Sequence, residues 1–341
     1  MNAPVQTDLT CIYCLTRKAS SEFNVEHVIP RSFGTFKNNF TLKNTVCKEC
    51  NTLFAQSLEI HLARDTIEGR MRFDHGIKKH KQFTHFGLER VRIKIADGPF
   101  AGQIVYLTFS EHSAKPVIMP IPQIGLKKRD NSGYEWFTFD RIPHREEVDE
   151  EIFDMHDPKS ICGSAELSAE DVKVALDNLG YNFTYRGEHM FNPQENAIAC
   201  DVEFRIDKTI KRAIAKVAFN YFCYVAGREV SLMRPFDMIR GFVRNKTDEP
   251  YPLLQISDIG ILEDEQAADS RRRLGHVITV NWAADNKSIV CQVSILNYWS
   301  YAVCIARDVR SVVELSPSGH FFNLASREIL ELGCRRKILE P

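Results

Sequence analysis

Two pairs of cysteines near the start of the chain have the spacing of a metal site. Cys11 and Cys14 form one Cys-x-x-Cys pair, and Cys47 and Cys50 form a second pair after 32 intervening residues. Two thiolates separated by two residues can bind one metal ion from a tight turn, and four thiolates complete the closed tetrahedron of structural Zn²⁺ sites. A redox dithiol is the alternative, but it rarely occurs twice around so short a segment. The cysteines therefore predict a structural zinc that stabilises a small segment.

An acidic residue and a histidine stand side by side between the two cysteine pairs, in the stretch NVEHVIPRSFG. A carboxylate and an imidazole on an apolar strand need water or a polar partner. Because neighbours on a strand point to opposite faces, Glu26 and His27 can diverge around one substrate. A neutral imidazole, which titrates at about pH 6.5, can accept a proton from water at neutral pH. A closed four-cysteine site has no open position for water, so this pair predicts a second, chemical site.

The combined pattern CIYC…VEHVIPRSFG…LKNTVCKECN resembles the HNH endonucleases, which have the ββα-metal nuclease fold. The resemblance covers about Cys11 to Leu62, which is under a fifth of the chain. It implies that His27 is a general base, activating water for in-line attack on a phosphodiester. It also implies that Asn44 orients the ring of His27.

The same resemblance implies one catalytic divalent cation, bound by Glu26 and Asn51. Two positions depart from the commonest family pattern, because Glu26 stands where Asp is usual and Asn51 stands where a final His is usual. A carboxylate and an amide carbonyl are hard oxygen ligands, which favour Mg²⁺ or Mn²⁺ over softer ions. The expected metals are therefore a structural Zn²⁺ and a catalytic Mg²⁺ or Mn²⁺.

The elements that must position these residues can be predicted from hydrophobic periodicity. After the second cysteine pair, Leu53, Phe54, Leu58 and Leu62 lie on one face of a helix that ends near Gly69. Later in the chain, helices are predicted over 168–180, 207–227 and 235–245, among runs typical of short strands. The expected fold class is α+β, with a small zinc-stapled ββα-metal domain followed by a larger mixed region.

The expected domains are an HNH domain over 1–75, a basic linker with a first strand over 76–94, and an α+β domain over 95–341. That last domain is a candidate for recognition, ligand sensing or oligomerisation, and the sequence leaves a homo-oligomer open. Residues 1–94 contain 15 Lys and Arg against 9 Asp and Glu, a net charge of +6, while the whole chain has −1. The remainder therefore carries −7, and the basic part is the candidate for an anionic partner.

Cations and aromatic residues are mixed in KKHKQFTHF, residues 78–86. Lys78, Lys79 and Lys81 suit contacts with nucleic-acid phosphates, and a solvated linker explains the same residues equally well. The expected nucleic acid is DNA, with RNA as the alternative. The chain has no secretory signal and no apolar span of about 20 residues, which predicts no membrane contact and a cytoplasmic location.

Three functions are compatible with these features. The leading interpretation is a metal-dependent HNH endonuclease that cleaves DNA, of the kind found in bacterial restriction or phage defence. A non-catalytic, zinc-dependent nucleic-acid-binding protein is an alternative, although such a protein does not need Glu26, His27, Asn44 and Asn51 together. The third is an effector in which a ligand bound to the C-terminal region controls the nuclease, but that region has no nucleotide-binding glycine loop.

Overall fold

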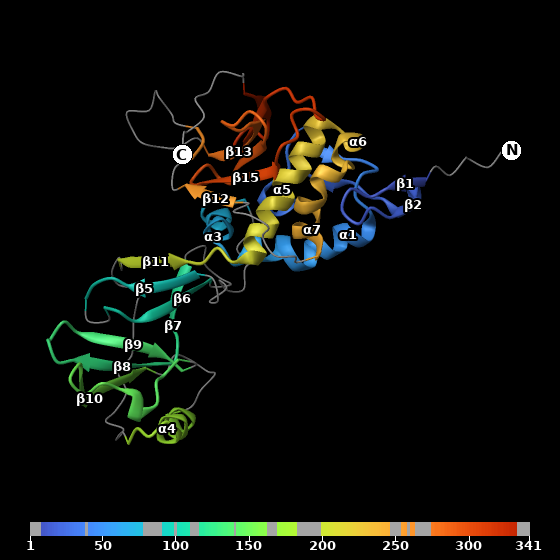
Figure 1. Cartoon of the computed structure of the whole chain (residues 1–341). Coiled ribbons are helices and arrows are strands. Elements are labelled where there is room, and N and C mark those ends of the chain that lie inside the picture. The colour runs from blue at the N-terminus through green and yellow to red at the C-terminus, as the bar shows by residue number, and fades with distance from the viewer. Residues whose placement is uncertain are drawn as a thin grey trace. The chain divides into compact units, whose positions relative to one another are not determined.

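A computed structural model of the protein divides the chain into two compact units (Figure 1). Unit 1 combines Met1–Arg64, Glu68–Ile77 and Ile206–Pro341, and unit 2 combines Asp65–Ile67 with Lys78–Arg205. The residues that the structure describes are 8–37, 40–77, 91–98, 101–109, 116–139, 141–161, 169–182, 199–245, 254–257, 260–262 and 274–332. The expected contacts of Lys78, Lys79 and Lys81 lie outside the described residues.

This division differs from the expected boundaries at 75 and 95. The N-terminal segment does not have a core of its own, because Phe54 and Leu58 belong to the same cluster of buried residues as Phe219 and Val293. A segment of about 60 residues buries too little apolar surface to be more than marginally stable, and here the C-terminal elements of unit 1 contribute the rest. Unit 2 is thus inserted between two parts of unit 1.

Two short antiparallel hairpins and a helical segment make up the N-terminal part of unit 1. The helix predicted after the second cysteine pair is present, and it contains a π-helical turn, η3. Cys47 has an extended backbone directly before this helix, so Cys50 lies in its first turn. The elements are β1 (Asp8–Thr10), β2 (Arg17–Ala19), η1 (Ser20–Glu22), β3 (Glu26–His27), η2 (Arg31–Phe33), β4 (Thr41–Leu42), α1 (Lys48–Phe54), η3 (Ala55–Glu59), α2 (Ile60–Arg64) and α3 (Ile67–Asp74).

The C-terminal part of unit 1 is a helical group with an antiparallel sheet of six strands in the order β12-β15-β14-β13-β16-β17. A polar turn at Asp285 and Asn286, predicted from the sequence, joins β13 to β14. The elements are α5 (Lys208–Ala226), α6 (Arg228–Ser231), η6 (Arg234–Phe236), α7 (Asp237–Asn245), β12 (Leu254–Ser257), β13 (Gly275–Trp282), β14 (Ile289–Ser294), β15 (Ser300–Ala306), β16 (Ser318–Asn323) and β17 (Ile329–Glu331).

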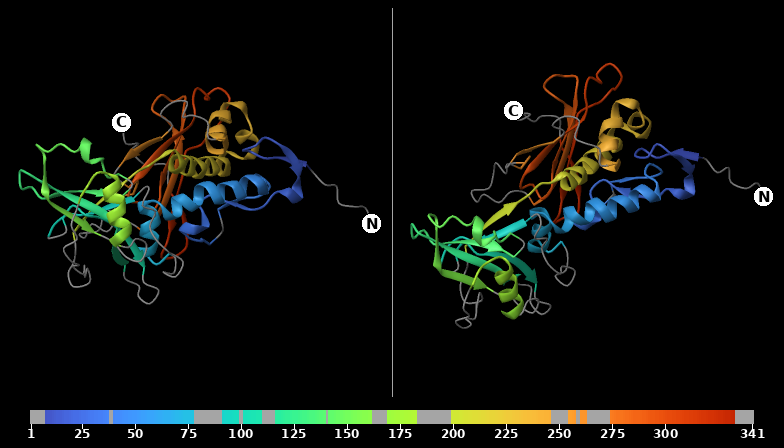
Figure 2. Two further views of the ribbon diagram at one scale, coloured as in Figure 1. Left: turned by 90° about the horizontal axis from the view of Figure 1, so that it is seen from below. Right: turned by 60° about the horizontal axis from the view of Figure 1, so that its bottom comes forward.

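Helix α5 is the central element of unit 1. Its ends follow from local chemistry, because the side chain of Asp207 accepts a hydrogen bond from the Ile210 N–H at 3.0 Å and Gly227 ends the helix at φ +88°. Between these ends every residue of α5 from Arg212 to Cys223 is buried. It contacts β13, β14 and β15 of the sheet, and it also contacts β4, η3 and α2 of the N-terminal part (Figures 1 and 2).

Unit 2 contains two antiparallel sheets, ordered β11-β5-β6-β7 and β10-β8-β9. The helix predicted from residue 168 is present as α4, and its Val172 and Leu176 pack against Ile124 and Leu126 of β8. The α+β fold class is confirmed. The elements of unit 2 are β5 (Val91–Ile95), β6 (Ile104–Phe109), β7 (Pro116–Pro120), β8 (Gln123–Lys128), β9 (Tyr134–Thr138), η5 (Arg145–Glu147), β10 (Phe153–Ile161), α4 (Ala169–Asn178) and β11 (Cys200–Phe204).

No helix in the described part of the chain is both long enough and apolar enough to cross a membrane.

Candidate functional site

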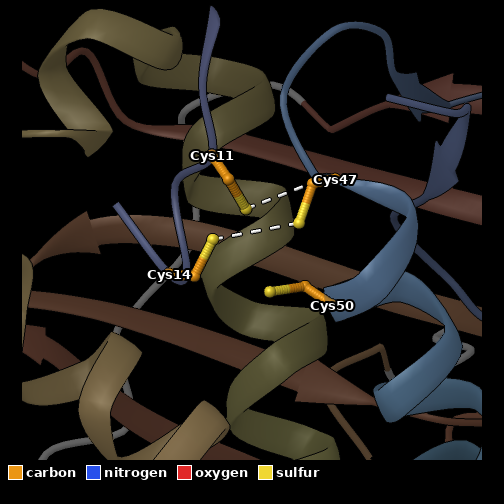
Figure 3. Close-up of side chains that lie close together, drawn as sticks. All are labelled: Cys11, Cys14, Cys47 and Cys50. Carbon is orange, nitrogen blue, oxygen red and sulfur yellow. Dashed lines mark hydrogen bonds between the residues drawn. The ribbon is translucent and has the colours of Figure 1, made fainter. Parts of the chain in front are cut away.

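The four cysteines of the two Cys-x-x-Cys pairs converge on one point (Figure 3). Their sulfur atoms all lie within 4.8 Å of one another, and the Sγ atoms of Cys14 and Cys47 are 3.8 Å apart. A tetrahedral zinc with Zn–S bonds of about 2.3 Å requires sulfur–sulfur distances of about 3.8 Å. The cluster therefore fits a structural zinc site, with Cys11, Cys47 and Cys50 buried and Cys14 half-buried.

Backbone groups hold the first cysteine pair in a tight turn, and the surroundings of Cys11 favour its thiolate form. The Leu15 N–H donates to the Cys11 carbonyl at 3.0 Å, and Leu15 adopts a left-handed φ of +56° that closes the turn. The Cys47 N–H donates to the Cys11 sulfur at 3.4 Å. A hydrogen bond from Cys50, together with such backbone N–H groups, lowers the pKa of Cys11 to about 4. The turn is therefore prepared to present a metal-binding thiolate.

Helix α7 supports this cluster from the C-terminal part of unit 1. The Arg244 Nε donates to the Cys50 sulfur at 3.3 Å, and the buried Arg240 donates through Nε to the Ile12 carbonyl at 2.9 Å. A guanidinium next to a thiolate offsets part of the negative charge that four thiolates bring to one ion. Neither arginine was predicted from the sequence, because nothing in the local pattern connects α7 to residues more than 190 positions earlier.

The acid and the histidine lie on β3, which pairs with β4 so that Glu26 is opposite Leu42 and His27 is opposite Thr41. Glu26 is only 3% exposed, whereas His27 is half-buried. The two side chains thus differ in access to solvent, as the alternation of a strand requires. His27 is the member of the pair with access to a molecule outside the protein.

Glu26 is held by two residues of α5. The ammonium of Lys216 bonds to Glu26 Oε1, and Asn220 Nδ2 donates to the same oxygen at 2.9 Å. Lys216 is fully buried and also bonds to Glu59 Oε1. Among the described residues, every hydrogen bond to the Glu26 carboxylate ends on Oε1, and Oε2 accepts none. One carboxylate oxygen is therefore fixed by α5, and the other is left for a further ligand.

Burial and charge shift the pKa values of Glu26 and Lys216 in opposite directions. Burial raises the pKa of Glu26, and the charge of Lys216 opposes that rise. Burial also acts to lower the pKa of Lys216, but the charges of Glu26 and Glu59 more than offset it and raise that pKa. Both contacts to Glu26 Oε1 come from donors, which favours the ionised form of this carboxylate.

The environment of His27 favours its neutral form. Burial, and then the positive charges of Arg31 and Lys216, lower the pKa of His27, while Glu59 acts in the opposite direction. A histidine with a lowered pKa is neutral at neutral pH, which is the form that accepts a proton. The site thus presents a half-buried imidazole next to a carboxylate that is anchored on one oxygen.

The two asparagines lie in different surroundings. Asn51, on α1, donates through Nδ2 to the Asn24 Oδ1 at 3.0 Å and is also 3.5 Å from the Val25 carbonyl, so it contacts the segment that leads into β3. Asn44 is exposed and has a left-handed φ of +57°. Within the described residues, no hydrogen bond joins Asn44 to His27. The structure therefore brings Asn51 close to the chain at β3 without showing the predicted contact of Asn44.

Lys216 and Asn220 were not predicted as site residues. The sequence does contain a signal, because a lysine and an asparagine interrupt the otherwise apolar run AIAKVAFNYFCYVAG. Fully buried lysines are rare unless they are paired, so this lysine required an acidic partner. Its position alone did not identify that partner, which lies 190 residues earlier.

We expect Lys216→Met to destabilise the protein strongly. The substitution keeps the volume of the side chain but leaves Glu26 and Glu59 without their buried counter-charge, and breaking a buried pair in this way costs about 3–5 kcal/mol. Urea unfolding of the zinc-loaded protein measures this cost. Lys208→Met, at the exposed start of α5, is the matched control and should change stability by less than about 0.5 kcal/mol. Equal stability of the two variants would mean that the ion pair is not stabilising.

Comparison with known families agrees with the resemblance found in the sequence. Residues 11–67 match the HNH endonuclease family. This segment is therefore similar to the HNH endonucleases over residues 11–67, and it carries a four-cysteine cluster that fits zinc. No curated protein and no solved structure matches the chain.

Proposed function

We propose that the protein is a metal-dependent HNH endonuclease that hydrolyses phosphodiester bonds in DNA. The observation that carries the proposal is the family match over 11–67, a segment that contains Glu26 and His27. The match supports nuclease activity and a nucleic-acid substrate. The choice of DNA, the roles of the residues and the catalytic cation are our proposal.

His27 acts as the general base in this mechanism. Its ring is half-buried, and its pKa is lowered by burial, so at neutral pH it is ready to accept a proton from a water molecule. The water, once deprotonated, attacks the phosphorus in line with the leaving 3′ oxygen. Asn44 is proposed to orient the ring once substrate is bound.

Glu26 and Asn51 supply the oxygen ligands proposed for a divalent cation. Glu26 Oε2 accepts no hydrogen bond from the described residues, and the amide nitrogen of Asn51 is used by Asn24, which leaves the amide oxygen for another contact. Hard oxygen ligands suit Mg²⁺ or Mn²⁺. When bound, such a cation neutralises charge on the scissile phosphate and on the leaving oxygen.

The metal dependence of the rate tests these roles. Glu26→Gln retains an oxygen for Lys216 and Asn220 but replaces the second carboxylate oxygen by an amide, so it should raise the Mn²⁺ concentration for half-maximal cleavage by at least about tenfold. Asn51→Ala should act in the same direction more weakly, because it removes a neutral ligand. The measurement is the cleavage rate against Mn²⁺ concentration for each variant.

Glu22→Gln, at an exposed acid of η1 in the same segment, is the matched control and should retain the metal dependence of the wild type. A Glu26→Gln protein with an unchanged Mn²⁺ dependence would remove Glu26 from the metal site. Recovery of a His27→Ala protein by excess Mn²⁺ would show that the roles of the two neighbours are reversed.

A further inference from the structure

Two side chains of α5 reach the strand that carries the HNH acid and histidine. Lys216 and Asn220 are four residues apart, so they lie on the same face of the helix, one turn from each other. Both are fully buried and both bond to Glu26. We call this pair the α5 clamp. Neither residue falls within 11–67, the part of the chain that matches the HNH family.

Asn220 connects three elements through one amide. Its Nδ2 donates to Glu26 Oε1 at 2.9 Å and to the His27 carbonyl at 3.3 Å, and its Oδ1 accepts from the Tyr13 hydroxyl at 2.8 Å. Tyr13 lies between the two cysteines of the first pair. The amide thereby links the turn of the metal cluster to the backbone of β3 at the proposed base.

Lys216 fixes the carboxylate from one side. Its ammonium bonds to Glu26 Oε1 and to Glu59 Oε1. These two bonds connect β3 to η3, in the helical segment after the second cysteine pair. Its carbonyl also lies 3.4 Å from the Tyr13 hydroxyl. Because both residues of the clamp act on Oε1, the direction of Oε2 is set by α5.

The β3–β4 pair cannot supply this rigidity by itself. It consists of two residues on each strand, and isolated two-stranded hairpins are marginal even when they are longer. A base and a metal ligand must be held close to their working geometry for efficient catalysis, because small displacements are costly to the rate. Helix α5 is buried and forms hydrogen bonds with β3, so it can restrain the position of this short strand.

We propose that Lys216 and Asn220 are positioning residues of the nuclease site, which orient Glu26 and the backbone of His27 without touching the substrate. This inference rests on the proposed function. It implies that the working HNH site consists of the N-terminal segment together with α5. In the sequence, α5 comes after the inserted unit 2.

Asn220→Ala tests the proposal in the full, zinc-loaded chain. We expect kcat for DNA cleavage to fall by about tenfold, the effect of one or two buried hydrogen bonds, with KM for DNA unchanged. Asn220→Gln, which keeps the amide donor, should recover part of the loss. The matched control is Tyr221→Phe, which removes a buried hydroxyl from the adjacent position of α5, where it bonds to His320 at 2.7 Å and not to β3. This control should retain the kcat of the wild type.

Hydrogen exchange provides a readout that does not depend on cleavage. The Val28 N–H donates to the Phe40 carbonyl at 3.1 Å, next to the β3–β4 pair. In Asn220→Ala this amide should exchange about tenfold faster, and in Tyr221→Phe it should exchange at the wild-type rate. Unchanged exchange together with an unchanged kcat in Asn220→Ala would overturn the proposal, as would an equal loss of kcat in Tyr221→Phe. If the Val28 amide exchanges faster in Asn220→Ala but the wild type cleaves no nucleic acid, then α5 does restrain β3 and the proposed nuclease function is wrong.

Discussion

Replacing Cys47 by serine is expected to release the zinc and to unfold the N-terminal part of unit 1. The serine hydroxyl is a poor zinc ligand at neutral pH, and the remaining three thiolates no longer close the tetrahedron. Structural zinc contributes about 10–16 kcal/mol of binding free energy in small metal-dependent domains, so its loss exceeds the total stability of most domains. The measurement is zinc content per chain together with thermal unfolding monitored by circular dichroism.

Cys304→Ser makes the same chemical change at a half-buried cysteine of β15, outside the cluster. It should retain about one zinc per chain, as should the wild type. A Cys47→Ser protein that contains no metal and still unfolds like the wild type would contradict the structural role of the cluster.

Replacing His27 by alanine is expected to abolish most of the cleavage while leaving the fold and zinc content intact. The ring is half-buried and is not part of the Lys216 network, so its removal leaves no buried charge without a partner. General-base catalysis contributes about 10²–10⁴ to a rate, and single-turnover cleavage of DNA should fall by that factor. His75→Ala, which removes a half-buried histidine of unit 1 outside the motif, should cleave at the wild-type rate.

The pH dependence of wild-type cleavage gives a second signature of His27. A general base works only in its neutral form, so the rate should fall as the pH drops through its pKa. Burial and the charges of Arg31 and Lys216 lower that pKa, which places the fall at a lower pH than an ordinary histidine would give. If the rate already falls at a pH above the ordinary pKa of histidine as the pH is lowered, His27 is not the general base.

Local features of the sequence predicted the local structure of unit 1 well. The spacing of the cysteine pairs predicted the cluster, because each pair is positioned by a turn of four residues. Asp207 and Gly227 predicted both ends of α5, since a cap depends only on the adjacent helical turn.

Long-range packing could not be predicted in the same way. The two side chains of the α5 clamp contact β3, which lies about 190 positions earlier in the sequence. Nothing in the local pattern specifies which buried acid Lys216 pairs with. The expected domains over 1–75 and 95–341 do not include the insertion of unit 2, for a related reason. Turn and linker signals mark where a chain changes direction, but they do not show that Ile206–Pro341 returns to the N-terminal core.

Nicking of supercoiled plasmid DNA by the full, zinc-loaded chain tests the central claim most directly. The wild type should nick the plasmid in Mn²⁺ or Mg²⁺, stop when EDTA is added, and resume when the cation is restored in excess. At the same concentration, His27→Ala should be slower by about 10²–10⁴. Equal nicking by the two proteins, or no cleavage of DNA or RNA by the wild type with any divalent cation, would contradict the proposal that this protein is an HNH nuclease.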